Sequence, residues 1–234
     1  MTLFRTKRNP HTHATIDLET LGTSGNSCVF EVGVAAATFS PDHFRLTNFK
    51  SRCYTFDLVE AMRCGSVDPR TIAWWISDAS IPQGVRDRLR KIWNREGNQR
   101  PHTIPEALMD LNRFLAETGA LSIWANGAAF DFVLTRDLFT NARRVYEQNS
   151  KFAPGWGYRD EMCLRPLRRA YSTLWKDAEQ EADLLMHDVL GPDSGKHAAD
   201  FDCLVNLTFL GQVNRRMPLV SEEIIRATED KSRQ

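Results

Sequence analysis

The chain has 234 residues, which favours one large domain over two small ones, and its 42% hydrophobic content is ample for a buried core. Lys and Arg balance Asp and Glu at 30 each, so the formal charge is zero, which argues against a protein held on nucleic acid by bulk electrostatics alone. No apolar run approaches the roughly 18 residues of a membrane span, and no hydrophobic signal core follows the basic N-terminus. The five cysteines form no C-x-x-C pair. We therefore expect a soluble cytoplasmic protein.

The predicted elements change in kind along the chain. Residues 1–11 are basic and aperiodic and predict a flexible arm, followed by a single domain over 12–228 and a flexible tail over 229–234. Alternating Ala14, Ile16 and Leu18 predict a first strand, and apolar runs over 28–38 and 44–54 predict two more, joined by turns in an antiparallel meander. Further strands are predicted over 121–125 and 155–158, and helices over 71–77, 82–93, 104–117, 130–144, 162–171, 176–188 and 198–216. The pattern predicts an α/β fold, a mixed sheet flanked by helices.

The first candidate site lies at the end of the first predicted strand, in Asp17-Leu18-Glu19. Residues two apart on a strand point to the same face, so the two carboxylates project side by side. Such a pair repels in water, but with divalent cations between them the carboxylates become the hard oxygen ligands that magnesium prefers. The alternative is a solvated strand end, because a triplet of this kind occurs about once by chance in a chain of this length.

The second candidate follows the strand over 121–125. Asn126-Gly127 is a turn pair that ends this strand, and Asp131 opens the next helix. An acid in a first turn is favoured by the helix dipole alone. Strand ends in α/β folds are also where ligands bind, so Asp131 is a candidate site residue as well.

The third candidate is the stretch from His197 to Asp202, after the turn-rich residues 191–195. On one helix the two side chains would lie about 140° apart around the axis, so they fit together only if His197 belongs to a mobile loop and Asp202 to the helix. Asp200 is a rival to Asp202 as the acidic residue. A histidine at a helix start is also common as a cap or surface residue.

Taken in order, these stretches resemble the three motifs of the DEDDh family of 3′–5′ exonucleases, namely Ile16-Asp17-Leu18-Glu19-Thr20, Asn126-x-x-x-Phe130-Asp131 and His197-x-Ala199-x-x-Asp202. Three stretches are similar to a branch of this family that holds phage-encoded DNA exonucleases and a mycobacterial exoribonuclease. They are Leu18-Glu19-Thr20-Leu21-Gly22, Thr71-Ile72-Ala73-Trp74-Trp75 and Trp124-x-Asn126-Gly127. The resemblance covers residues 12–212. It implies a ribonuclease-H-like fold and an enzyme that releases nucleoside 5′-monophosphates from 3′ ends.

The resemblance also implies a role for each site residue. Asp17, Glu19 and Asp202 match the ligands of one metal ion, and Asp17 with Asp131 match those of a second. The expected cofactor is two Mg²⁺ ions, with Mn²⁺ as a substitute, and His197 matches the general base. The offset of Asp200 from His197 does not match the motif. The residues that match the cradle of the terminal nucleotide are Thr20, Leu21, Gly22 and Asn126.

The expected partner is nucleic acid with a free 3′ end, DNA in preference to RNA and single-stranded or frayed, in the cytoplasm of a bacterium or a phage-infected host. An exoribonuclease, an endonuclease on the same fold and a nucleic-acid-binding module without catalysis are the alternatives. One of Trp74 and Trp75 is predicted in the core, and phosphate contacts are predicted for Arg165, Arg168 and Arg169. Residues 171–195 predict an extra helix whose acids disfavour a duplex. The sequence leaves the oligomeric state open.

Overall fold

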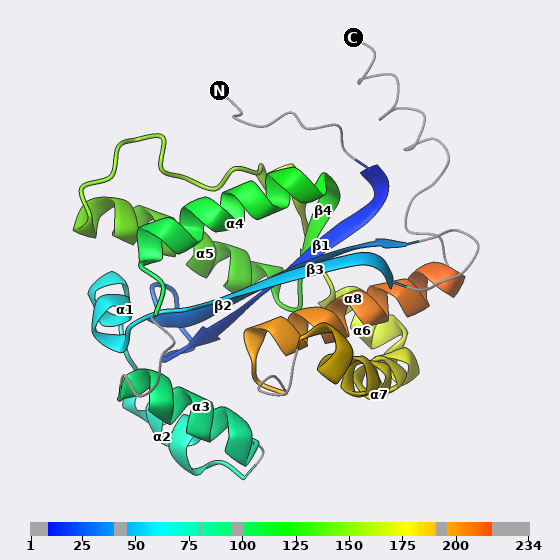
Figure 1. Ribbon diagram of the computed structural model, residues 1–234, viewed down its shortest axis with the longest axis horizontal. Coiled ribbons are helices and arrows are strands. Elements are labelled where there is room, and N and C mark those ends of the chain that lie inside the picture. The colour runs from blue at the N-terminus through cyan, green and yellow to red at the C-terminus, as the bar shows by residue number, and fades with distance from the viewer. Residues whose placement is uncertain (1–8, 40–45, 80, 95–100, 191–195, 217–234) are drawn as a thin grey trace.

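A computed structural model describes residues 9–39, 46–79, 81–94, 101–190 and 196–216 (Figure 1). Its centre is one five-stranded sheet in the order β3-β2-β1-β4-β5. The strands are β1 (Asn9–Thr20), β2 (Val29–Phe39), β3 (Leu46–Thr55), β4 (Ala120–Ala125) and β5 (Glu161–Cys163). β1, β2 and β3 pair antiparallel, whereas β4 and β5 run parallel to β1. The predicted mixed sheet with an antiparallel meander is therefore confirmed.

The helices cover the two faces of this sheet and one of its ends (Figure 1). One face carries α4 (Ile104–Thr118) and α5 (Ala128–Val145), and the other carries α6 (Arg165–Ala170), α7 (Ser172–Val189) and α8 (Ala199–Arg216). Three helices, α1 (Leu58–Cys64), α2 (Pro69–Ser77) and α3 (Gln83–Trp93), lie beyond the end of the sheet that β1 reaches. No helix in the described ranges combines the length and apolar character that a membrane crossing requires.

The alternation along β1 divides its side chains between two cores. Ala14, Ile16 and Leu18 pack in the core beneath α4 and α5. The intervening positions face α8, as shown by Thr15, whose Oγ1 donates to the Cys203 carbonyl at 3.0 Å. Asp17 and Glu19 therefore project from the sheet toward α8.

Two sequence predictions about β-structure differ from the structure. The last strand is Glu161–Cys163, not residues 155–158, which form a turn held by Asn112 and by the three-residue 3₁₀ turn Tyr158–Asp160. A three-residue strand is too short to show alternation. β1 begins at Asn9, so residues 9–11 belong to the sheet and not to the predicted arm.

Three helix predictions also need adjustment. The helix predicted over 162–171 begins at Arg165, and the next begins at Ser172 and not at 176. α1 was not predicted, although Asp57 and Glu60 at cap spacing are a signal for it, and Asp57 accepts from the Val59 and Glu60 amides. The predicted turn at 40–42, the loop at 191–195 and the tail lie outside the described residues.

Candidate active site

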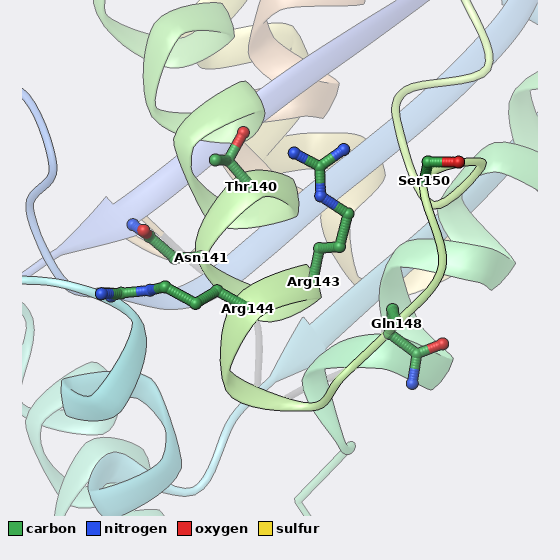
Figure 2. Close-up of a pocket in the computed structure, with 6 residues that line it drawn as sticks. All are labelled: Thr140, Asn141, Arg143, Arg144, Gln148 and Ser150. Atoms are coloured by element: carbon green, nitrogen blue, oxygen red, sulfur yellow. The ribbon is translucent and has the colours of Figure 1, made fainter.

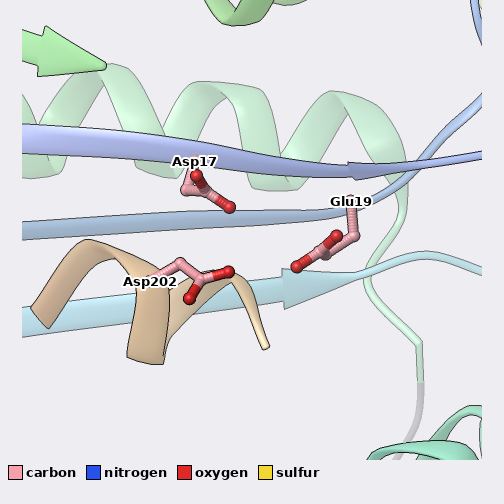
Figure 3. A group of neighbouring side chains, drawn as sticks. All are labelled: Asp17, Glu19 and Asp202. Atoms are coloured by element: carbon pink, nitrogen blue, oxygen red, sulfur yellow. The ribbon is translucent and has the colours of Figure 1, made fainter. Parts of the chain in front are cut away.

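Three carboxylates converge where β1 ends against the first turn of α8. The nearest side-chain oxygens of Asp17, Glu19 and Asp202 all lie within 4.8 Å of one another. Figure 3 shows the three carboxylates pointing toward a common centre. Asp200, the rival in the same helical turn, is not in this cluster. The arrangement follows from period two on the strand and from the fixed position of Asp202 on the helix.

Asp131 lies next to this cluster but outside the 4.8 Å group. It is buried in the first turn of α5, at 6% exposure, and its charge raises the pKa of Asp17. Gly127 precedes the helix, and a Cβ there would lie 3.0 Å from Arg165 Nη2 and 3.4 Å from Asp131 Oδ2. Asp131 and the Arg165 guanidinium therefore border the same turn.

Burial and mutual repulsion disfavour ionisation of these acids. Burial, followed by the charges of Asp202, Asp131 and Glu31, raises the pKa of Asp17 well above its ordinary value. Burial also raises the pKa of Asp131 to about 7, opposed by Arg165, and that of Asp202 to about 7, opposed by Lys196. A divalent cation would relieve this repulsion, and a donor set of carboxylate oxygens alone fits a hard ion such as Mg²⁺.

His197 lies two residues before the first residue of α8, outside the helix that carries Asp202, as its spacing from Asp202 predicted. Its backbone is in the left-handed region at φ 64°, so it does not continue the helix that begins at Ala199. Its ring lies edge-on to two indoles of α2, with centroids 5.4 Å from Trp74 and 6.3 Å from Trp75. Burial and then the charge of Lys196 lower the pKa of the imidazole. The ring is therefore held largely neutral at neutral pH.

The predicted nucleotide cradle is ordered by its own hydrogen bonds. Thr20 Oγ1 donates to the Gly22 carbonyl at 2.6 Å, and the Thr20 carbonyl accepts from Trp75 Nε1 at 2.9 Å. Leu21 has only 1% exposure and packs in the core, and its amide and carbonyl bond Cys28 and Asp68. Leu21 thus offers a nucleotide no free polar group among the described contacts.

Asn126 directly follows β4, the parallel neighbour of β1 in the sheet. Its Oδ1 is buried and has no hydrogen-bond partner within the described part of the chain. A buried acceptor of this kind is costly unless a ligand or water satisfies it. Its carbonyl accepts from Arg165 Nε at 3.0 Å, which holds Arg165 beside the site.

The other two arginines predicted to contact phosphate differ from Arg165. The guanidinium of Arg168 stacks over the Trp175 ring at 3.9 Å, so it packs α6 against α7. Arg169 is exposed on α6. Of the tryptophan pair, Trp75 is the core residue at 2% exposure and Trp74 is partly buried.

Glu31 is a site neighbour that the sequence did not single out. It is fully buried on β2, and it accepts hydrogen bonds from the Ala199 amide and from Thr55 Oγ1, both at 3.0 Å. The available signal was an acid inside an otherwise apolar strand, residues 29–37.

A separate depression of about 710 Å³ lies at the C-terminal end of α5 (Figure 2). Its lining contains no carboxylate, histidine or cysteine, so it offers no general base to activate its two hydroxyl groups. Its lining residues are Thr140, Asn141, Arg143, Arg144, Gln148 and Ser150.

Comparison with known proteins places these residues in a sequence family. The sequence model of the 3′-5′ exoribonuclease Rv2179c-like domain matches residues 12–201. No curated protein matches the sequence. Three solved structures similar to this one are apo exonuclease I (TM-score 0.51), an ExoI/SSB-Ct complex (0.50) and the E. coli exonuclease I structure interpreted in terms of processivity (0.50), each 14% identical.

These matches cover 88% of this chain and 41% or 42% of the others, so the chain spans about two fifths of their length. At this identity the likeness concerns the fold alone.

Proposed function

Because the chain belongs to the Rv2179c-like 3′-5′ exoribonuclease domain family, we propose that it removes nucleoside 5′-monophosphates one at a time from the 3′ end of a single strand. The predicted ribonuclease-H-like fold and the resemblance to DEDDh 3′–5′ exonucleases are confirmed. The observation that carries the proposal is the convergence of Asp17, Glu19 and Asp202 within 4.8 Å, beside buried Asp131.

Two Mg²⁺ ions are the proposed cofactor, with Mn²⁺ as a substitute. Asp17, Glu19 and Asp202 would hold one ion, and Asp17 with Asp131 the other. When bound, the ions would lower the pKa of the attacking water and offset the charge on the leaving 3′-oxygen. The raised pKa values of Asp17, Asp131 and Asp202 support this assignment, because a cation restores the ionised form that burial disfavours.

His197 is the proposed general base. A general base must be neutral to accept a proton, and the lowered pKa of His197 meets that condition at neutral pH. The imidazole would take the proton of the attacking water while the water oxygen forms its bond to phosphorus and the 3′-oxygen of the next nucleotide leaves. The indoles of Trp74 and Trp75 limit the directions in which the ring can turn.

The 3′ end of the nucleic acid is proposed to lie between the Thr20–Gly22 turn and Asn126. The buried Oδ1 of Asn126 is the acceptor left for a sugar hydroxyl or a base amino group. Arg165, held at the Asn126 carbonyl, is the proposed contact for a backbone phosphate.

The sequence favoured DNA, but we take RNA as the first substrate because the matched family is described as an exoribonuclease.

The test is digestion of 5′-labelled RNA and DNA, each single- and double-stranded, with Mg²⁺ and with EDTA. We expect a ladder that shortens by one nucleotide, requires metal, and disappears in Asp17→Asn. A binding module would retain the strand without shortening it. An endonuclease would cut a circular strand, which an exonuclease leaves intact. Either result would overturn the proposal, and the faster of the two sugars identifies the preferred substrate.

A further inference from the structure

The start of α8 is held against β2 by a buried carboxylate. Glu31 has 0% exposure, and its Oε1 accepts the Ala199 amide hydrogen at 3.0 Å. Ala199 is the first residue of α8, so its amide is one of the donors that a helix leaves unsatisfied within itself. The partial positive charge of a helix N-terminus strengthens this bond to a carboxylate.

A glycine on the same strand allows the close approach. A Cβ on Gly33 would lie 2.2 Å from the Ala199 carbonyl oxygen and 2.7 Å from the Asp200 amide nitrogen. Any side chain at this position would displace the helix from the sheet. Glu31 and Gly33, two apart, therefore act on the same turn of α8 from the same face of β2.

The sheet register connects this attachment to the metal cluster. Glu31 pairs with Glu19, and Gly33 pairs with Asp17, in the antiparallel ladder between β1 and β2. Paired residues project to the same face of a sheet. The residue pairs that contain Asp17 and Glu19 therefore also contain Gly33 and Glu31. These two residues of β2 hold the helix that carries Asp202, the third carboxylate of the cluster.

We propose that Glu31 is a positioning residue, which with Gly33 holds the N-terminus of α8 where Asp202 can share a cation with Asp17 and Glu19. The inference rests on the proposed function for the identity of the cluster as a metal site. Thr55 Oγ1, donating to the other carboxylate oxygen at 3.0 Å, fixes the orientation of Glu31 from β3. Neither Glu31 nor Thr55 belongs to the three-carboxylate cluster.

Glu31→Gln tests the proposal because it keeps the shape of the side chain and one acceptor oxygen while removing its charge. Loss of a group that orients metal ligands typically weakens metal affinity about 10- to 100-fold. We expect a loss of that size for Mn²⁺ binding, measured by calorimetry on the whole chain without nucleic acid. The Mg²⁺ concentration for half-maximal nuclease rate should rise in parallel, with the rate largely recovered at saturating Mg²⁺.

Thr15→Val is the matched control. It removes another buried hydrogen bond to α8, at the Cys203 carbonyl, one turn beyond the site end of the helix. We expect it to lower Tm without changing Mn²⁺ affinity. If Glu31→Gln also lowers Tm but binds Mn²⁺ as the parent does, Glu31 is only a structural acid and the proposal is overturned.

Gly33→Ala is a second variant with the same predicted effect, a loss of Mn²⁺ affinity in any protein that folds. If it does not fold, Glu31→Gln still decides. If the parent binds Mn²⁺ but degrades no nucleic acid, the proposed function falls while the calorimetry still tests Glu31. If the parent binds no divalent cation, both fall.

Discussion

Asp202→Asn should make the metal-free protein more stable above neutral pH while it weakens the stabilisation by Mg²⁺. Burial raises the pKa of Asp202 to about 7 from an ordinary value of 3.8. Its contribution to stability is therefore complete below about pH 4 and is lost as pH rises through 7. At about 1.36 kcal/mol per pKa unit this loss amounts to about 4 kcal/mol, or about 2 kcal/mol if water enters the partly exposed site.

The asparagine variant avoids this loss, because its side chain never ionises. A gain of about 2–4 kcal/mol corresponds to a Tm rise of roughly 4–16 °C for a domain of this size. The assay is thermal unfolding in EDTA at pH 5 and pH 8, where the advantage of the variant should be larger at pH 8. With Mg²⁺ at about 100 times its Kd, the ion held by Asp17, Glu19 and Asp202 should add about 2.7 kcal/mol to the stability of the parent, and the variant should lack this contribution.

Asp200→Asn is the control, since Asp200 lies in the same first turn of α8 but outside the carboxylate cluster. It should keep both the Mg²⁺ response and nuclease activity. The assignment of Asp202 would be refuted if Asp200→Asn lost the Mg²⁺ response and Asp202→Asn kept it. A Tm of Asp202→Asn that equals the parent's at both pH values would refute the electrostatic reasoning alone.

Three further predictions concern the rest of the site. His197→Ala should lower the rate by about 10²–10⁴-fold yet still bind Mn²⁺. Because burial lowers the pKa of the imidazole, the parent's rate should rise with pH through a midpoint below the ordinary histidine value of 6.5, and equal rates of parent and variant at every pH would exclude His197 as the base. Trp75→Phe removes the hydrogen-bond donor to the Thr20 carbonyl and should lower the free energy of unfolding by about 1–3 kcal/mol, measured as a lower Tm. It should also raise the KM for the nucleic-acid substrate, and an unchanged KM would show that Trp75 does not contribute to substrate binding. Glu179→Gln removes a charge on α7 that raises the pKa of Asp202, and it should increase cleavage of duplex ends relative to cleavage of single strands. Asp183 is exposed on the same helix, and Asp183→Asn should leave this ratio unchanged; equal duplex-to-single-strand ratios in the two variants would contradict a role for Glu179.

Point substitutions are needed on α7 because the helix forms part of the core. Leu174, Ala178 and Ala182 are buried against α8, and the Trp175 ring lies 5.2 Å from that of Phe209. Removing the helix would expose this surface and destabilise the helix that carries Asp202. The extra helix predicted within residues 171–195 is therefore present as α7, and its effect on duplex cleavage stays a prediction.

Local features of the fold and site could be predicted from the sequence. Period two places Asp17 and Glu19 on one face, and the helical phase separates His197 from Asp202, so these placements depend only on neighbours in the chain. The three strands of the meander and most helices were predictable for the same reason. The α7 and α6 starts and the three-residue β5 were not, because tertiary pairing decides short elements.

Long-range contacts explain what the sequence did not reveal. Glu31 reaches the amide of a residue 168 positions away, and Trp75 reaches Thr20 across 55. Neither pairing leaves a periodic signal in one sequence. The shielding of His197 by two indoles and the burial of Leu21 follow from the same tertiary contacts, so only the structure shows them.

The location of the carboxylates in the chain has a consequence for how the molecule becomes active. Asp17 and Glu19 come from the first strand and Asp202 from the last described helix, so the cluster joins residues that are far apart in the sequence. Contacts of such high sequence separation form late, because closing the intervening loop costs entropy before it is repaid. During synthesis, a chain that is still growing on the ribosome would contain Asp17 and Glu19 before Asp202 has been added. Nascent chains, which lie beside the messenger RNA, would therefore lack nuclease activity. The activity would appear only when α8 packs against the sheet.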